Sequence, residues 1–214
     1  MEKKIAVILG DGIGPEVTNQ SIKVLNMIAK QYGHQFSYEY ALMGAVAIDE
    51  TGNPLPDETI AICKNSDAIL FGAIGDPKYD NDPTAKVRPE QGLLKLRKEL
   101  QLFANIRPVK TYPSLQHLSP LKAKHLENVD FVIFRELTGG IYFGAKSLSE
   151  DGTVAKDDCS YSVMEIERVA HLAFQYAQKR NKHLTLVDKA NVLETSRLWR
   201  KVVQGIAKAY SDVQ

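Results

Sequence analysis

Short apolar runs and segments with helical spacing alternate along the first part of the chain. IAVIL (5–9) and DAILFGAIG (67–75) have the length of buried strands, and FSYEYAL (36–42) alternates as a strand does. Between them, PDETIAICKNS (56–66) predicts a short helix, and a longer helix is predicted after Pro15. The residues on one face of that longer helix are Val17, Ser21, Val24, Leu25, Ile28 and Tyr32. This alternation predicts an α/β fold with a mostly parallel sheet.

A long loop and a further helix follow. GDPKYDNDPTAKVRP (75–89) is rich in Pro, Asp and Gly, and loops of this length in compact domains are often functional. From Gly92 the pattern becomes helical, and its expected core stripe is Leu93, Leu96, Leu100 and Phe103. On a neighbouring face, spacings of four and seven residues bring together Glu90, Leu94 and Arg97. We expect this second face to point the same way as the loop.

Strands and two amphipathic helices are predicted in the second half. The strands are DFVIFRE (130–136), GGIYFGAKSL (139–148) and LTLVDKA (184–190), the last of them buried. The helices cover residues 163–179 and 192–210. Asp151-Gly152 is a hairpin turn signal, so the chain around it predicts a projecting β-arm.

Composition narrows the class of partner. The 27 basic and 26 acidic residues are well mixed and leave a net charge of +1, so nucleic acid and anionic membranes are not expected partners. No apolar run approaches the length of a membrane span, and MEKKIAVIL leads directly into a strand rather than a signal peptide. Cys63 and Cys159 suggest neither a disulfide framework nor a zinc site. We expect a cytoplasmic protein that binds a small molecule.

The stretch GDGIGPEV (10–17) allows two interpretations. Its glycines invite comparison with the dinucleotide-binding fingerprint, but the spacing is G-x-G-x-G and Pro15 stands where the fingerprint needs its last glycine. No acid follows at the distance expected for the ribose hydroxyl. A tight turn that requires small residues is the favoured interpretation, with a phosphate cradle as the alternative.

Three arginines occupy positions at the ends of expected elements. Arg97, Arg107 and Arg135 each have the fork that suits a carboxylate or phosphate, and Arg135 ends an apolar strand, where α/β proteins place ligand contacts. The alternative for each is a structural ion pair.

A lysine and a tyrosine are candidates for proton transfer. Lys189 follows the expected buried strand, where partial loss of solvent would lower its pKa and make it a general base; pairing with Asp188 is the alternative. Tyr142 follows two glycines that allow close approach, and its phenol can donate a proton, although a core role is the alternative.

Four blocks taken together are far more specific than any one of them. GDGIGPEV, RPEQGLLKLRKELQLFANIRPVK, FRELTGGIYFG and VDKANVLETSRLWR occur in the order seen in the isocitrate/isopropylmalate family of β-decarboxylating dehydrogenases, which the chain resembles along essentially its whole length. The resemblance implies the two-domain α/β fold of the isopropylmalate dehydrogenases, not a Rossmann fold. It also implies that residues 1–103 belong to the first, cofactor-side domain, and residues 104–214 to a second domain whose arm at about 140–160 builds a homodimer.

Within that family the resemblance is strongest to the enzymes of leucine biosynthesis. Leu93 and Leu94 suit the isopropyl group of 3-isopropylmalate and would leave an extra carboxylate without a partner. We therefore expect 3-isopropylmalate as the substrate, with isocitrate, homoisocitrate and tartrate as the alternatives. By resemblance, Arg97, Arg107 and Arg135 clamp the malate carboxylates. Tyr142 protonates the enol left by decarboxylation, Lys189 assists removal of the hydroxyl proton from across the dimer, and Val192 lines the isopropyl pocket with Leu94.

The resemblance also implies two cofactors, NAD and a divalent Mg or Mn ion. The residues implied near the nicotinamide end of NAD are Ile13, Gly75, Asp76, Pro77, Lys78, Tyr79, Glu90 and Asn191. The metal would polarise the carbonyl of the keto acid before decarboxylation. Family members are longer, and their metal ligands and adenosine-binding loop correspond to positions beyond residue 214.

We therefore expect a truncated chain without dehydrogenase activity by itself. Loss of the rest of the first domain's sheet would leave sheet edges and apolar helix faces exposed. The alternative from another class is a non-catalytic module that binds an anion or forms a dimer.

Overall fold

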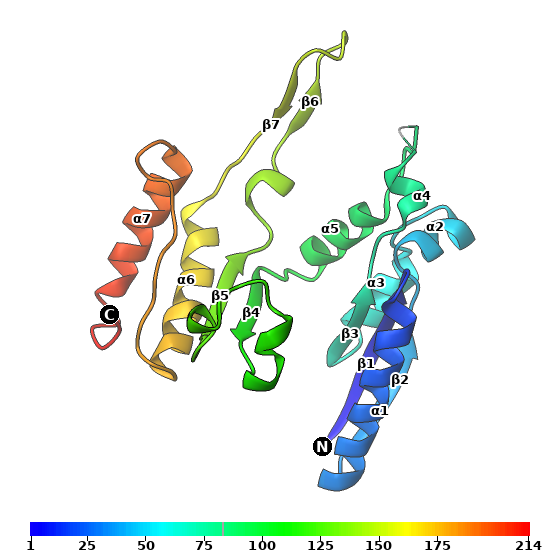
Figure 1. Ribbon diagram of the computed structural model, residues 1–214. Coiled ribbons are helices and arrows are strands. Elements are labelled where there is room, and N and C mark those ends of the chain that lie inside the picture. The colour runs from blue at the N-terminus through cyan, green and yellow to red at the C-terminus, as the bar shows by residue number, and fades with distance from the viewer. Residues whose placement is uncertain (83) are drawn as a thin grey trace. The chain divides into compact units, whose positions relative to one another are not determined.

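The chain divides into two compact units, Met1–Leu100 and Gln101–Gln214. The computed structural model describes residues 1–82 and 84–214, so Pro83 of the expected long loop lies outside the described residues. Figure 1 labels the elements of each unit. The boundary expected from the sequence, after residue 103, lies a few residues further along the chain. Helices and strands occur in both units, and the α/β prediction is confirmed.

A three-stranded parallel sheet forms the centre of the first unit. Its order is β2 (Gln35–Tyr40), β1 (Glu2–Gly10), β3 (Ala68–Ala73), and all three strands were predicted. The run Ile5–Ile8 in β1 is buried because this strand has a neighbour on each side. Strand β3 was expected to be buried, but its side chains are only half-buried or exposed. Within the described sheet β3 is an edge strand, which accounts for the difference.

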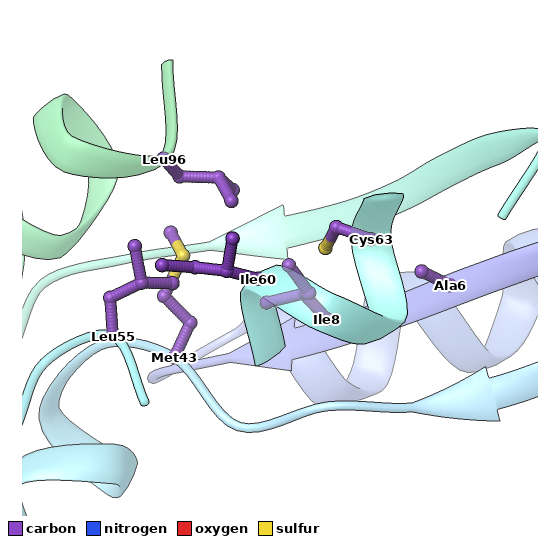
Figure 2. Close-up of a cluster of buried hydrophobic side chains, with 7 residues drawn as sticks. All are labelled: Ala6, Ile8, Met43, Leu55, Ile60, Cys63 and Leu96. Carbon is purple, nitrogen blue, oxygen red and sulfur yellow. The ribbon is translucent and has the colours of Figure 1, made fainter. Parts of the chain in front are cut away.

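Helices cover both faces of this sheet. α1 (Gly14–Tyr32) packs on all three strands. On the other face a cluster joins β1 to α3 (Asp57–Lys64) and α5 (Pro89–Glu99), as Figure 2 shows. Its members are Ala6, Ile8, Met43, Leu55, Ile60, Cys63 and Leu96. The two short helices α2 (Ala45–Thr51) and α4 (Pro77–Asp80) complete the unit, and α4 lies within the expected long loop.

Two details of the predicted helices are corrected. In α1, Val17, Val24, Ile28 and Tyr32 are exposed, whereas Thr18 and Ala29 are buried. Small side chains on that face allow close packing, since a Cβ at Gly72 would overlap the Thr18 hydroxyl.

The stripe predicted for α5 is only partly correct. Leu93 and Leu100 pack against the cluster with Leu96, but the helix ends at Glu99. Phe103 belongs to the second unit, where the guanidinium of Arg168 lies 5.0 Å from its ring centroid. The chain turns at Gln101, which has a φ of +52° and so cannot continue the helix.

An antiparallel strand pair and two helices form the body of the second unit. β4 (Ala104–Lys110) pairs with β5 (Asp130–Glu136), α6 (Val163–Gln178) packs on β5, and α7 (Glu194–Ala207) packs on α6. The core between the helices contains Ile166, Ala170, Phe174 and Val203. Two 3-10 turns, η1 (Pro113–Leu118) and η2 (Ala123–His125), connect β4 to β5. The predictions of β5, α6 and α7 are confirmed, whereas β4 was not predicted.

A two-stranded arm extends from this unit (Figure 1). β6 (Lys146–Leu148) pairs with β7 (Ala155–Asp157), and the projecting β-arm is confirmed. At its turn the Asp151 carboxylate accepts bonds from the Ser149 and Thr153 hydroxyls and the Thr153 amide. These bonds lower the pKa of Asp151 to about 2, with the Ser149 bond contributing most.

The strand predicted over residues 139–148 is wrong for most of its length. Residues Gly140–Tyr142 form a 3-10 turn, η3, and only Lys146–Leu148 are extended in a ladder. Gly140 has a φ of +75°, and a Cβ there would overlap the Tyr161 hydroxyl. Because a β-strand needs a negative φ, the chain turns at Gly140 instead of continuing as a strand.

The buried strand predicted over residues 184–190 is also wrong. The described segment pairs with no strand, and Val187 is 89% exposed. Residues 183–188 line a cavity of about 890 Å³ together with residues of β5 and α6, and Leu184 and Leu186 pack against the core between α6 and α7. Without a neighbouring strand the segment cannot form a ladder. It keeps an alternation of half-buried and exposed side chains.

Candidate functional site

Two of the three candidate arginines share one face of the β4–β5 pair. Arg107 lies opposite Ile133, and Asn105 lies opposite Arg135, so the two arginines are diagonal neighbours on the same side of the pair. Arg107 donates from Nε to the Asn105 side-chain oxygen over 2.5 Å, which orients its guanidinium. Arg107 lies in the middle of β4 rather than at an element end as expected, whereas Arg135 is the second-last residue of β5. Both arginines are exposed.

Tyr142 joins this pair. The guanidinium carbon of Arg135 lies 5.1 Å from the Tyr142 ring centroid, a cation–π geometry. Half of Tyr142 is exposed, so it is not a core residue. Arg107, Arg135 and Tyr142 therefore form one exposed group with two cations and a phenol, which can hold carboxylates and supply a proton.

A buried carboxylate fixes the turn that brings Tyr142 to Arg135. The side chain of Glu136 is 1% exposed, and it accepts bonds from the Thr138 amide at 2.9 Å and the Gly139 amide at 2.6 Å. It also accepts from the Thr138 hydroxyl at 2.9 Å and from Arg168 Nη2 at 2.7 Å. Because Thr138 and Gly139 lie between Arg135 and Tyr142, this network determines where the phenol is placed.

Lys189, Asn191 and Val192 lie together between the cavity-lining segment and α7. The amides of Val192 and Leu193 both donate to the Lys189 carbonyl at 3.0 Å, which makes a tight turn. Lys189 is exposed, contrary to the expected desolvation at a strand end. Asp188 pairs with Arg200 rather than with Lys189, and this bond lowers the pKa of Asp188. Arg135 and Asp188 both line the cavity of the second unit.

In the first unit the turn of GDGIGPEV lies against the end of β3. Gly10 has a φ of +70°, and a Cβ there would overlap the Ala73 carbonyl, so the tight-turn interpretation is confirmed. Asp11, which is buried, donates its amide to Ala73 over 2.7 Å. Its carboxylate accepts from the amides of Ala45, Val46 and Gly75 at 2.9, 3.0 and 2.9 Å. The exposed Ile13 is thereby held on the same turn that is bonded to Gly75.

Hydrogen bonds from α2 and from the end of the loop itself hold the loop after Gly75. Asp49 of α2 pairs with Lys78 and accepts a 2.9 Å bond from the Tyr79 hydroxyl. These bonds lower the pKa of Asp49, the Lys78 bond most strongly. Arg88, at the end of the loop just before α5, donates to the Tyr79 and Asp82 carbonyls at 2.5 and 3.1 Å. Asp76 caps the start of α4 by accepting from the Lys78 amide, and Pro77 is the first residue of that helix.

Glu90, Leu94 and Arg97 are carried by α5. The exposed Glu90 lies close to Gly75, because its Oε1 would be 3.4 Å from a Cβ at that glycine. Leu93 packs on the core cluster, whereas Leu94 and Arg97 are half-buried outside it. Of the two leucines, Leu94 is therefore the better placed to meet a ligand.

Sequence reasoning missed the residues that support these groups. Asp11 and Arg88 bond mainly to backbone groups, and Glu136 bonds to two backbone amides and two side chains. No short sequence motif predicts such bonds. An acid between two glycines at a strand end was the available signal for Asp11, and a cation just before a helix-starting proline was the signal for Arg88.

No group of three or more His, Cys, Asp or Glu side chains in the described part of the chain is arranged to hold a metal ion. Among the described residues, no helix is long and apolar enough to cross a membrane.

A family model described as isocitrate/isopropylmalate dehydrogenase matches residues 4–214. The chain belongs to the isocitrate/isopropylmalate dehydrogenase family. A 3-isopropylmalate dehydrogenase from Bacteroides fragilis is 57% identical over 213 residues, which is 100% of this chain and 60% of that relative. One from Bacillus subtilis is 53% identical over 218 residues, again 100% of this chain and 60% of the relative.

Solved structures of family members agree with this membership. An isocitrate dehydrogenase from Methylococcus capsulatus superposes with a TM-score of 0.83 at 29% identity, covering 99% of this chain and 58% of that one. A β-decarboxylating dehydrogenase from Thermococcus kodakarensis gives 0.70 at 32% identity, covering 97% and 55%. The chain thus spans about 60% of the length of the curated family members it matches. The isopropylmalate-dehydrogenase-like fold expected from the sequence is confirmed.

Proposed function

We propose that the protein oxidises and decarboxylates 3-isopropylmalate to 2-oxoisocaproate, with NAD as hydride acceptor, in leucine biosynthesis. The observation that carries the proposal is the 57% identity to the Bacteroides fragilis 3-isopropylmalate dehydrogenase across the whole of this chain. The exposed group of two arginines and a tyrosine supports it, because a dicarboxylate needs cations to replace its water.

The proposed substrate contacts lie on β4, β5 and α5 and on the turn that contains Val192. Arg107 and Arg135, on one face of β4–β5, hold the carboxylates, and Arg97 of α5 is the third candidate cation. By the family resemblance, Leu94 and Val192 are each proposed to contact the isopropyl group. A carboxylate in place of that group would lose its water against leucine without gaining a partner, which disfavours isocitrate.

Two residues are proposed to move protons. Lys189 assists removal of the proton from the substrate hydroxyl as the adjacent carbon loses its hydride. After the carboxylate leaves as carbon dioxide, Tyr142 gives its phenolic proton to the carbon of the resulting enol. The half-exposed Tyr142 beside Arg135 is consistent with this role.

The described residues include proposed contacts for NAD but no group arranged to hold a divalent metal ion. Exposed Ile13, the Gly75–Tyr79 loop, Glu90 and Asn191 are the proposed contacts for the nicotinamide end of NAD, and an apolar side chain on a turn bonded to Gly75 fits a flat ring. Bound NAD would supply the hydride acceptor. A divalent Mg or Mn ion is proposed as the second cofactor, although the described residues contain no group of three or more His, Cys, Asp or Glu side chains arranged to hold it. We also propose a cytoplasmic homodimer built by the β6–β7 arm.

A comparison of substrates tests the proposal. The full-length gene product is assayed for NADH formation with 3-isopropylmalate, isocitrate and tartrate, each with NAD and Mg. We expect kcat/KM for 3-isopropylmalate to exceed that for the other two by at least about 100-fold. A higher kcat/KM for isocitrate or tartrate would overturn the substrate assignment, and no NADH with any of the three would overturn the reaction.

A matched pair of variants on β4 tests the anion clamp. Arg107→Gln should lower kcat/KM for 3-isopropylmalate by about 100-fold, since a charge-assisted bond to the substrate is lost. Lys110→Gln, at the exposed end of the same strand, should stay within about twofold of the parent. Equal effects of the two substitutions would argue against a clamp at Arg107.

A further inference from the structure

The segment that carries Lys189 has no helix or strand of its own. Residues 183–189 form no described regular structure, and residues 183–188 line a cavity together with residues of β5 rather than pairing with a strand. A side chain on such a segment is fixed only as well as its backbone is held, so the contacts that hold this backbone determine where the ammonium lies.

The Leu184 amide donates to the Gln214 carbonyl at the start of the segment, and near Lys189 the contacts come from three side chains of α7. Arg200 donates to both carboxylate oxygens of Asp188, from Nε over 3.0 Å and from Nη2 over 2.7 Å. Ser196 accepts a 3.1 Å bond from the Lys189 amide. Arg197 donates to the Ala190 carbonyl over 3.0 Å and to the Val192 carbonyl over 3.3 Å. Each residue from 188 to 190, and Val192, is therefore bonded to the same helix.

The strongest of these contacts directly precedes Lys189. The Asp188 side chain is 7% exposed, and its Oδ1 also accepts a 3.0 Å bond from the Ala190 amide, so the carboxylate bridges α7 and the backbone on the far side of Lys189. Two parallel bonds from a guanidinium fix a carboxylate in angle as well as distance. The Arg200 bond and the Ala190 amide both lower the pKa of Asp188, so this acid stays ionised in the neutral range.

Alternation places Lys189 on the opposite side of the segment from its anchor. Asp188 faces the protein while Lys189 is exposed, as successive side chains of an extended backbone point in opposite directions. Holding Asp188 therefore directs Lys189 outward without contacting its side chain.

We propose that Arg200 is a positioning residue that acts through Asp188 to fix the direction of Lys189, with Ser196 and Arg197 holding the backbone on either side. The proposal rests on the role assigned to Lys189 in the proposed function. It makes the polar face of α7 part of the support for proton transfer rather than a solvated helix face. Arg200 contacts neither substrate nor cofactor in this account, so its effect must disappear when Lys189 is absent.

A double-mutant cycle in the full protein tests this dependence. The variants are Arg200→Gln, Lys189→Met and the double substitution, with Lys201→Gln as the control because Lys201 is the exposed neighbour of Arg200 on α7. We measure kcat and KM for 3-isopropylmalate and the thermal midpoint of each variant. Asp188→Asn, which keeps the side-chain shape, is the second variant if Arg200→Gln does not fold.

The expected results separate positioning from general support. Arg200→Gln should lower kcat by about tenfold or more with KM within about twofold, because a small misplacement of a catalytic group slows the chemical step. Arg200→Lys should restore part of that loss, and Lys201→Gln should match the parent. Lys189→Met should lower kcat by at least about 100-fold, and adding Arg200→Gln should change the residual rate by less than about twofold.

Two outcomes would overturn the proposal and are distinguishable. If Arg200→Gln lowers the rate by the same factor with and without Lys189, Arg200 does not act through Lys189, and the proposed function is unaffected. If Lys189→Met keeps the parent kcat, the role of Lys189 in the proposed function fails and the positioning proposal fails with it.

Discussion

Replacing Glu136 by Gln removes one charge from the most buried acid of the second unit. The carboxylate accepts from two backbone amides, a hydroxyl and Arg168, and its side chain is 1% exposed. Gln keeps the size and one oxygen acceptor, but its amide nitrogen must face groups that are themselves donors. The Thr138 hydroxyl can rotate to accept, whereas Arg168 can only donate.

The expected loss of stability follows from which hydrogen bonds to residue 136 remain. The amides of Thr138 and Gly139 can keep a neutral oxygen, so each loses roughly 1 kcal/mol of charge assistance. Arg168 loses its carboxylate but is 27% exposed and still donates to the Thr138 hydroxyl over 2.5 Å, so its penalty is smaller than for a fully buried pair. We expect the free energy of unfolding to fall by about 3 kcal/mol.

Urea unfolding of the full protein, followed by the fluorescence of Trp199 in the second unit, measures this loss. The control is Glu167→Gln, an exposed acid on α6 next to Arg168, which should change stability by less than about 0.5 kcal/mol. If Glu136→Gln is as stable as Glu167→Gln, the buried network does not hold the 138–142 turn, and the account of how Tyr142 is placed is wrong.

Four further predictions concern stability and pH. Asp11→Asn should lower the free energy of unfolding by about 2 kcal/mol in urea titrations, because one of its three bonded backbone amides would face another donor; an unchanged midpoint would contradict this. Gly140→Ala should lower stability by about 2 kcal/mol, since it combines a φ of +75° with overlap of the Tyr161 hydroxyl. Gly205→Ala, at an exposed position of α7 with open space around it, should raise the free energy of unfolding by up to about 1 kcal/mol, so thermal unfolding should shift in opposite directions for the two glycine substitutions. The pKa of Asp151 lies at about 2, below its ordinary value of 3.8, so the arm turn is stabilised above pH 3.8 and loses that contribution as pH falls through about 2. The carboxyl carbon of Asp151 should titrate by NMR near 2, and a midpoint at 3.8 would refute the turn's hydrogen bonding.

The sequence predicted the elements whose identity depends on local pattern. The run Ile5–Ile8 and the amphipathic spacing of α6 specify their own burial, and the structure confirms them. The alternation of residues 36–42 identifies strand β2, but Tyr40 is exposed and Glu39 half-buried, so the alternating burial is not confirmed. Strand β4 was missed because Pro108 and two charged residues interrupt its pattern. Proline is tolerated there because β4 is paired on one side only, which no local pattern reveals.

The two wrong strand predictions fall where side chains outside the segment decide its backbone conformation. Residues 139–148 read as a strand, but the Glu136 carboxylate and the Tyr161 hydroxyl impose a turn on the two glycines. The segment 184–190 reads as a buried strand, yet it is held from α7 by Arg200 and Arg197 instead of by a ladder. Candidate residues were found by chemistry and resemblance, whereas their supports are visible only once the chain is folded.

The ratio of the reaction products distinguishes an oxidative decarboxylase from an enzyme that only oxidises its substrate. The full protein is incubated with 3-isopropylmalate, NAD and Mg, and NADH, carbon dioxide and 2-oxoisocaproate are measured in the same sample. We expect the three products to form in equal amounts. Lys201→Gln should leave this unchanged, and Lys189→Met should slow the formation of all three together. NADH formed without carbon dioxide, or no NADH at all, would contradict the claim that this protein is an oxidative decarboxylase of 3-isopropylmalate.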